Sequence, residues 1–300
     1  MTLQILGPAV RQSYLPISQP YALSVTTNVT DTAIAFLGLS EYAHADSRRS
    51  RLLKSGDYDV YKNALRAAAS RFCVPTPVQP LELWETGSHL KTNELAGWNY
   101  GVSTRIGECI EYVFDSTQKL INRMKRKKKK PSSVRFPLCF VTKQSGQVLG
   151  WTYPIEVRIC EKMFLTPLLR ELKDIPDGSL TFAEAASVPA FVIYDIFDIL
   201  CDNISFSRRN GVPVPHHVAT RWKNVYHNMV WFFIHASLVM PDGRVYRKSH
   251  GLTPGSEFYS LINSFVTMMC AGGKKPWLPQ RRAKVNTANE IESENRLSAK

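Results

Sequence analysis

The chain has 300 residues, of which 44% are hydrophobic and 11% are aromatic. This content is enough to bury a core in one large domain or two ordinary ones, which excludes a chain that is disordered throughout. The formal net charge of +13 favours a polyanionic partner, either RNA or an anionic membrane surface, without choosing between the two.

The apolar stretches are too short to cross a bilayer. The longest, 230–234 and 261–269, fall well below the roughly 20 residues of a transmembrane helix, so we expect no membrane-spanning segment. Residues 1–10 carry no charged segment ahead of their apolar stretch, which is not typical of a secretory signal. We therefore expect an intracellular, cytoplasmic protein.

The first half of the chain predicts an arm, a helix and a pair of strands. Residues 1–50 are rich in Ser, Thr and Pro, and we expect the region 1–71 to form an extended arm over a core. Apolar residues within 106–124 fall on one helical face and predict a helix. Two short apolar runs within 135–152 flank a Gln-Ser-Gly turn at 144–146 and predict paired strands.

A basic run follows the first helix. Seven of the eight residues at 123–130 are basic, and Pro131 ends the helix. Such a run binds phosphates, acts as a nuclear import signal or keeps a loop solvated, and of these we favour RNA contact. The candidate RNA-binding side chains are Arg123, Lys125, Arg126, Lys127, Lys128, Lys129 and Lys130. Aromatic residues upstream offer stacking surfaces for bases, although aromatic side chains belong more often to a core. They are Phe72, Trp84, Trp98 and Tyr100.

The second half predicts two helices and a hairpin. A helix start signal at 187–189 is followed by apolar residues at spacings of four, four and three, which extend the helix to about Asn203. The Pro-Asp-Gly sequence at 241–243 predicts a hairpin turn, because proline presets φ and glycine supplies a positive φ. Apolar residues on one face predict a second helix over 258–269, and 272–300 is expected to be a polar tail.

Neither the cysteines nor the histidines predict a metal site. The six cysteines include no C-x-x-C pair, so reduced and mostly buried thiols are predicted. His216 and His217 follow Pro213 and Pro215 in an expected loop, whereas zinc needs four converging ligands. No metal ligand is therefore assigned.

The order of strand, helix, hairpin, glycine loop and helix between 178 and 269 leads to a family resemblance. The segment 240–258, MPDGRVYRKSHGLTPGSEF, resembles motif B of the partitivirus-like RNA-dependent RNA polymerases. The segment 151–168, which begins WTYP, resembles the stretch after the basic fingers motif of that family. Residues 186–189 resemble the segment that follows motif A. The resemblance extends over 146–269.

The resemblance implies an α+β fold with right-hand polymerase-like fingers and an incomplete palm. The fingers-like region is expected at 72–175. The partial palm, which holds the motif A and motif B regions, is expected at 176–271.

The motif B loop keeps most of the residues that the resemblance requires. Gly251, Gly255 and Ser256 match the family, while Pro254 replaces a serine. Asn263 matches a position that reads the ribose 2′-hydroxyl in related polymerases. The resemblance therefore implies that these matching residues bind RNA or nucleotide.

The carboxylates that such a polymerase needs are missing. The family joins nucleotides with two Mg²⁺ ions, which are held by carboxylates of motifs A and C. Aligned back from Pro189, the motif A aspartates fall at Leu180 and Ala185, which cannot bind a metal. The chain has no Asp-Asp pair for motif C, and beyond Asn263 its only carboxylate side chains are three glutamates at 290–294. We therefore expect neither a catalytic residue nor a bound Mg²⁺.

Other carboxylates do not replace them. Asp195 and Asp198, three residues apart, are expected on the solvated face of their helix. Glu184 lies nearer to motif A but has no partner from motif C.

The favoured function is that of a viral RNA polymerase-like protein that is catalytically incompetent and binds single-stranded RNA without sequence preference. One alternative is a structural or interaction protein that reuses this surface for a viral or host protein. Another is a fragment of an active polymerase whose remaining palm lies on another chain, although Leu180 and Ala185 weigh against it. Cytoplasmic location is expected, with nuclear import through 123–130 as the alternative.

Overall fold

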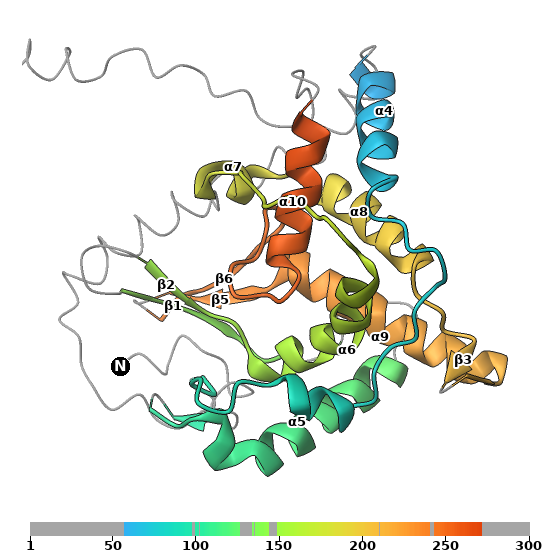
Figure 1. The fold of residues 1–300 in the computed structure, drawn as a ribbon. Helices are drawn as coiled ribbons and strands as arrows, with labels where there is room; N and C mark the ends of the chain where they lie inside the picture. Colours follow the sequence, from blue (N-terminus) through green and yellow to red (C-terminus); the bar gives the residue numbers. More distant parts are fainter. Residues whose placement is uncertain are drawn as a thin grey trace, which may run out of the picture.

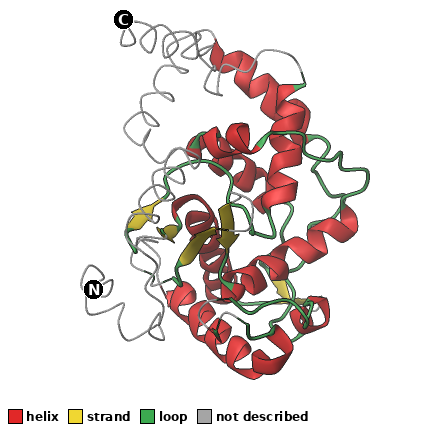
Figure 2. Cartoon of the chain, turned by 90° about the vertical axis from the view of Figure 1, so that its left-hand side faces the viewer, coloured by secondary structure: helices red, strands yellow, loops and turns green. Residues whose placement is uncertain are grey.

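The computed structural model describes residues 57–97, 100, 101, 103–126, 134, 136–143, 149–209, 211–240 and 243–271. Helices dominate this part of the chain and surround a few short strands (Figure 1; Figure 2). The helices are α4 (Asp57–Ala69), the 3₁₀ helix η3 (Glu85–His89), α5 (Ile106–Arg126), α6 (Ile155–Glu171), α7 (Phe182–Ser187), α8 (Ala190–Asp202), α9 (His216–His235) and α10 (Tyr259–Cys270). The mixture of helices with mainly antiparallel strands confirms the α+β class.

The main sheet joins two hairpins that lie far apart in the sequence. Its strands are β1 (Cys139–Lys143), β2 (Leu149–Thr152), β5 (Ser237–Val239) and β6 (Val245–Arg247), in the order β2-β1-β5-β6. Strands β1 and β2 are antiparallel, as are β5 and β6, whereas β1 and β5 are parallel. Both predicted hairpins are confirmed, and Gly243 has the expected positive φ of 84°. A separate small hairpin pairs β3 (Arg208–Arg209) with β4 (Val212–Pro213).

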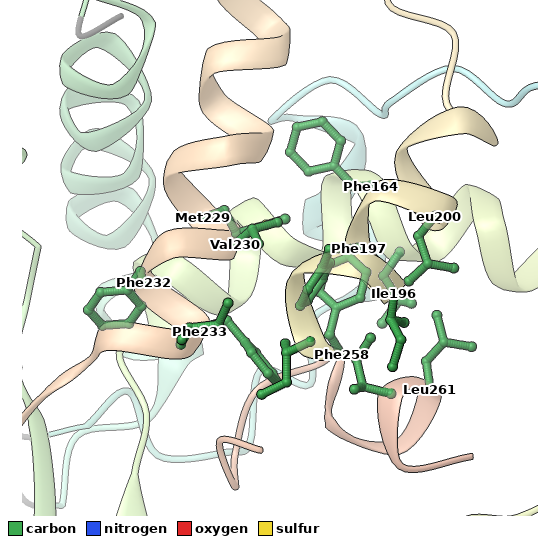
Figure 3. Packing of buried hydrophobic residues seen from close by; sticks show 14 of the residues in the cluster. Phe164, Ile196, Phe197, Leu200, Met229, Val230, Phe232, Phe233, Phe258 and Leu261 are labelled. Atoms are coloured by element: carbon green, nitrogen blue, oxygen red, sulfur yellow. The ribbon is translucent and has the colours of Figure 1, made fainter. Parts of the chain in front are cut away.

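The core lies where α6, α8, α9 and α10 meet, and aromatic rings fill it (Figure 3). The ring of Phe197 makes edge contacts with the rings of Phe233 and Phe258, each with a centroid separation of 5.2 Å. The ring of Phe164 makes a similar contact with Tyr226 at 5.4 Å. Edge-to-face pairs of this kind add to the free energy gained by burying the rings. None of the described helices has both the length and the apolar character required to cross a membrane.

The three helices predicted from periodicity are present as α5, α8 and α10. None of the six cysteines, all of which lie in the described part of the chain, forms a disulfide, and five of them are buried while Cys73 is exposed, which confirms the prediction of mostly buried thiols. Of the expected arm, the structure describes only 57–71, and most of this segment forms α4, which packs against α8 and α10.

Two expectations from the sequence are wrong. His216 and His217 are the first residues of α9 rather than part of a loop, because Pro215 occupies the N-cap position, where its missing N–H costs nothing. The strand expected around Leu180 does not form. Instead, Thr181 and Glu184 make a capping box that starts α7: the Thr181 hydroxyl accepts from the Glu184 N–H, and the Glu184 carboxylate accepts from the Thr181 N–H.

Candidate functional site

Four of the candidate site residues lie together where 178–188 packs on the glycine loop and α10. The Leu252 N–H donates to the Ala185 carbonyl at 2.8 Å, and the Gly251 N–H donates to the Val188 carbonyl at 2.7 Å. The Leu180 N–H donates to Oδ1 of Asn263 at 3.3 Å. Leu180, Ala185, Gly251 and Asn263 therefore belong to one neighbourhood, although up to 83 residues separate the hydrogen-bonded partners.

Two glycines leave room for this close approach, one to a backbone carbonyl and the other to the Asn263 side chain. At Gly251 φ is +77°, and an added Cβ would lie 2.3 Å from the Ala186 carbonyl oxygen. At Gly178 an added Cβ would lie 2.4 Å from Cγ of Asn263. Both distances are shorter than any real Cβ contact, so a side chain at either position would force the segments apart.

A buried carboxylate fixes the far end of the glycine loop. Glu161 of α6 is fully buried and accepts from the hydroxyls of Tyr153 at 2.6 Å and Ser256 at 2.9 Å. It also accepts from the Glu257 N–H at 2.8 Å. Burial raises the pKa of Glu161 to about 7, although these three donors favour the ionised form and lower it. The motif B match at Ser256 is thus part of a hydrogen-bond network inside the protein.

A buried lysine holds the near end of the loop. The ammonium group of Lys248 donates to the Gly251 carbonyl, and burial lowers the pKa of Lys248 to about 7. The Lys248 charge is the second cause, after burial, that lowers the pKa of His235 to about 4. The loop is therefore anchored by polar groups at both ends, and Gly255, with φ +83°, lies exposed between the anchors.

Sequence reasoning did not single out Glu161 or Lys248. Glu161 appeared only inside the stretch that resembles the fingers, and Lys248 only inside the motif B string. A signal was available for Glu161 alone, which lies among the apolar residues Ile159, Cys160, Met163 and Phe164 on a helix buried on most sides. An ionisable residue in such a run requires partners when the helix is buried.

The positions aligned with the motif A aspartates do not fit a two-magnesium site. Leu180 is a partly buried loop residue, and Ala185 is 2% exposed within α7. Glu184 is engaged in the capping box. Among the described residues, no group of three or more His, Cys, Asp or Glu side chains is arranged to hold a metal ion.

Asp195 and Asp198 of α8 differ from each other. Asp198 is exposed, as expected for a solvated face. Asp195 is half-buried and accepts from the Tyr61 hydroxyl at 2.6 Å, so its placement on that face is wrong. This hydrogen bond ties α8 to α4.

The basic run is described only at its start. Arg123 and Arg126 are exposed on the last turns of α5, and Lys125 is half-buried beside them. Lys127, Lys128, Lys129 and Lys130 lie outside the described residues.

The four aromatic candidates for base stacking differ in how far they are buried. Phe72 is fully buried and stacks on Phe265 with a centroid separation of 4.5 Å. Tyr100 is half-buried and donates its hydroxyl to Glu156 at 2.9 Å. Trp84 is 74% exposed, and Trp98 lies outside the described residues. Trp84 is thus the described member of the set with a ring open to solvent.

No protein-family model matches the chain, and no curated protein matches it.

Proposed function

We propose that the chain is a polymerase-derived, catalytically incompetent RNA-binding protein, with fingers at 72–175 and an incomplete palm at 176–271. One observation carries this proposal. The segment aligned with motif A and the residues that follow it, 180–189, is hydrogen-bonded to Gly251 and Leu252 of the segment that resembles motif B and to Asn263. In a right-hand polymerase these motifs line one active site, so their contact here supports a common origin.

The neutral side chains at Leu180 and Ala185 support the loss of catalysis. Nucleotide transfer needs carboxylates that hold two Mg²⁺ ions on opposite sides of the reacting phosphate. Buried methyl and methylene groups offer no oxygen ligands. The nearest carboxylate in sequence, Glu184, already accepts hydrogen bonds from Thr181.

Charge supports RNA as the ligand. The net charge is +13, and seven of the eight residues at 123–130 are basic. Lysine and arginine bind phosphates without reading the bases, because the interaction releases counterions from the nucleic acid. The RNA would therefore be bound without sequence preference.

Binding of a labelled oligouridylate at a series of salt concentrations tests this function. We expect affinity to fall steeply with salt, and replacement of Lys127 to Lys130 by glutamine to flatten the slope by about 0.7 for each phosphate that is no longer neutralised. Binding that is absent at low salt would overturn RNA binding and leave the protein-interaction alternative. An unchanged slope would remove the run from the binding surface.

A further inference from the structure

The end of α5 lies beside a second set of basic residues from distant parts of the chain. The ammonium nitrogen of Lys125 lies 4.0 Å from the ring centroid of Trp222 on α9, and Cζ of Arg209 on β3 lies 4.2 Å from the same centroid. Both are cation–π distances, so one indole ring organises two cations. Arg209 also forms an ion pair with Glu82.

The helix end is fixed at this place by α9. Nδ2 of Asn224 and Nδ2 of Asn228 donate to the Lys125 and Met124 carbonyls, each at 3.4 Å. These carbonyls belong to the last turn of α5, which has no intrahelical partners for them. The basic run therefore begins at a defined position next to α9 and β3.

The cluster brings together like charges that oppose folding. Burial lowers the pKa of Lys125, and the nearby Arg209 and Arg221 lower it as well, whereas Glu82 raises it. Arg221 is exposed, and so are the sequence neighbours of the two central cations, Arg123 and Arg126 on the last turns of α5 and Arg208 on β3. Glu82 is one carboxylate beside the three cations Lys125, Arg209 and Arg221, and positive charge clustered in this way destabilises a compact protein until a further anion offsets it.

We infer that the end of α5, the β3–β4 hairpin and the start of α9 form one RNA-binding surface, which receives the sugar-phosphate backbone of single-stranded RNA. We call it the α5–α9 basic surface, and define it by Arg123, Lys125, Arg126, Arg208, Arg209 and Arg221. Trp222 is only 7% exposed, so it holds the cations in place rather than stacking on a base. The inference rests on the proposed function, and adds residues from two elements that the sequence did not connect with the basic run.

The test compares two double variants of the full chain. Arg208→Gln with Arg221→Gln removes two exposed charges from the α5–α9 basic surface. Arg66→Gln with Arg71→Gln removes two exposed charges on or directly after α4, away from this surface (Figure 1). Because the two variants have the same net charge, a difference between them reports the place of the charge and not its amount. Thermal unfolding of each variant checks that the fold is kept.

We expect the first variant to flatten the salt dependence of oligouridylate binding by about 1.4, because two phosphates of a single strand are no longer neutralised, and the second to leave it unchanged. Equal slopes for the two variants, in a wild-type protein that binds RNA, would overturn the α5–α9 basic surface alone. Absence of binding by the wild type would overturn the proposed function together with it. Binding to vesicles of anionic lipid in place of RNA would identify the surface as a membrane contact and overturn the assignment.

Discussion

Gly251 has a positive φ and also lies where an added Cβ would meet the Ala186 carbonyl oxygen. Gly211 has the positive φ without the close contact, so a comparison of the two glycines separates the cost of the backbone conformation from that of the contact. Gly211 has nearly the same φ, +78°, but an added Cβ there meets nothing within 4 Å. We expect Gly211→Ala to cost about 1–2 kcal/mol of stability, which is the penalty of a left-handed backbone. Gly251→Ala adds the contact with the Ala186 carbonyl, and we expect it to cost roughly 1–3 kcal/mol more.

Chemical denaturation of the two glycine variants measures this difference directly. An equal loss of stability in both would mean that the 251 loop moves away from α7 without penalty. The loop would then not be held against the Ala186 carbonyl.

Glu161 predicts a pH dependence with a defined sign. Burial raises its pKa from 4.5 to about 7 in the folded protein. The folded state therefore holds the proton more tightly than the unfolded state, and Glu161 imposes no penalty below pH 4.5. As pH rises from 4.5 to 7 the unfolded state releases this proton while the buried carboxyl keeps it, so the protein loses stability, and the loss approaches about 3 kcal/mol.

The Glu161→Gln variant isolates this effect. His235, whose pKa is lowered to about 4, acts with the opposite sign in the same range, but it is present in both proteins and cancels in their difference. We expect wild type to lose stability relative to the variant as pH rises from 4.5 to 7, measured by denaturant unfolding. A difference that stays constant over this range would show that Glu161 is already ionised at low pH.

At the scale of elements, local patterns were sufficient for α5, α8, α10 and both hairpins of the main sheet. Each of these has an apolar stripe or a turn signal that lies within its own sequence. Helix α9 was not predicted, although its apolar residues Trp222, Val225, Tyr226 and Met229 recur at helical spacing. Further buried residues, among them Asn228, Val230 and Ile234, widen the buried face over most of the helix, so the pattern is less regular than a narrow stripe.

The strand expected at Leu180 does not form, because contacts with a distant helix satisfy its backbone. The Ser179 and Leu180 N–H groups donate to Thr267 and Asn263 on α10, so the backbone needs no neighbouring strand. Part of the answer was readable, because Thr181 and Glu184 have the spacing of a capping box. The pairing of β1 with β5 joins residues about a hundred positions apart, which no local pattern specifies.

We expect aspartate to lower the stability of the fold by unequal amounts at the two positions aligned with motif A. Ala185 is 2% exposed, and a carboxylate there would be buried without a partner, so we expect Ala185→Asp to cost at least about 3 kcal/mol. Leu180 is only partly buried in a loop, and Leu180→Asp should cost about 1 kcal/mol. Thermal unfolding of the two single variants measures both. Equal and small losses would mean that Ala185 faces an open cleft and not the core.

At the scale of the whole molecule, the candidate site is a contact between segments that no local sequence pattern joins. The residues that resemble motif B stand out in the sequence because their string is distinctive. Their anchors come from elsewhere: Glu161 lies on α6, and the Val188 carbonyl that receives the Gly251 N–H lies between α7 and α8. The α5–α9 basic surface arises in the same way, since Arg209 and Trp222 follow the basic run by some eighty residues or more.

The proposed loss of catalysis leads to a prediction about its repair. Purified protein with a primed RNA template and Mg²⁺ or Mn²⁺ should incorporate no nucleotide above a no-protein control. Leu180→Asp with Ala185→Asp should remain inactive, because motif A can supply ligands from only one side of a two-metal site. The substitution at Ala185 also opposes folding, so activity must be measured on protein that circular dichroism shows to be folded.

The decisive comparison adds a motif C segment after Met269 to the double aspartate variant and tests each change alone. In the variant that carries both changes, the grafted carboxylates would have to reach positions 180 and 185. The N–H groups of Ser179 and Leu180 in this segment donate to side chains of α10. Activity that appears only with both changes would support a palm that lost its carboxylates from two motifs. Template-dependent incorporation by the double aspartate variant without the graft would show that the alignment of motif A is wrong or that another part of the chain supplies motif C.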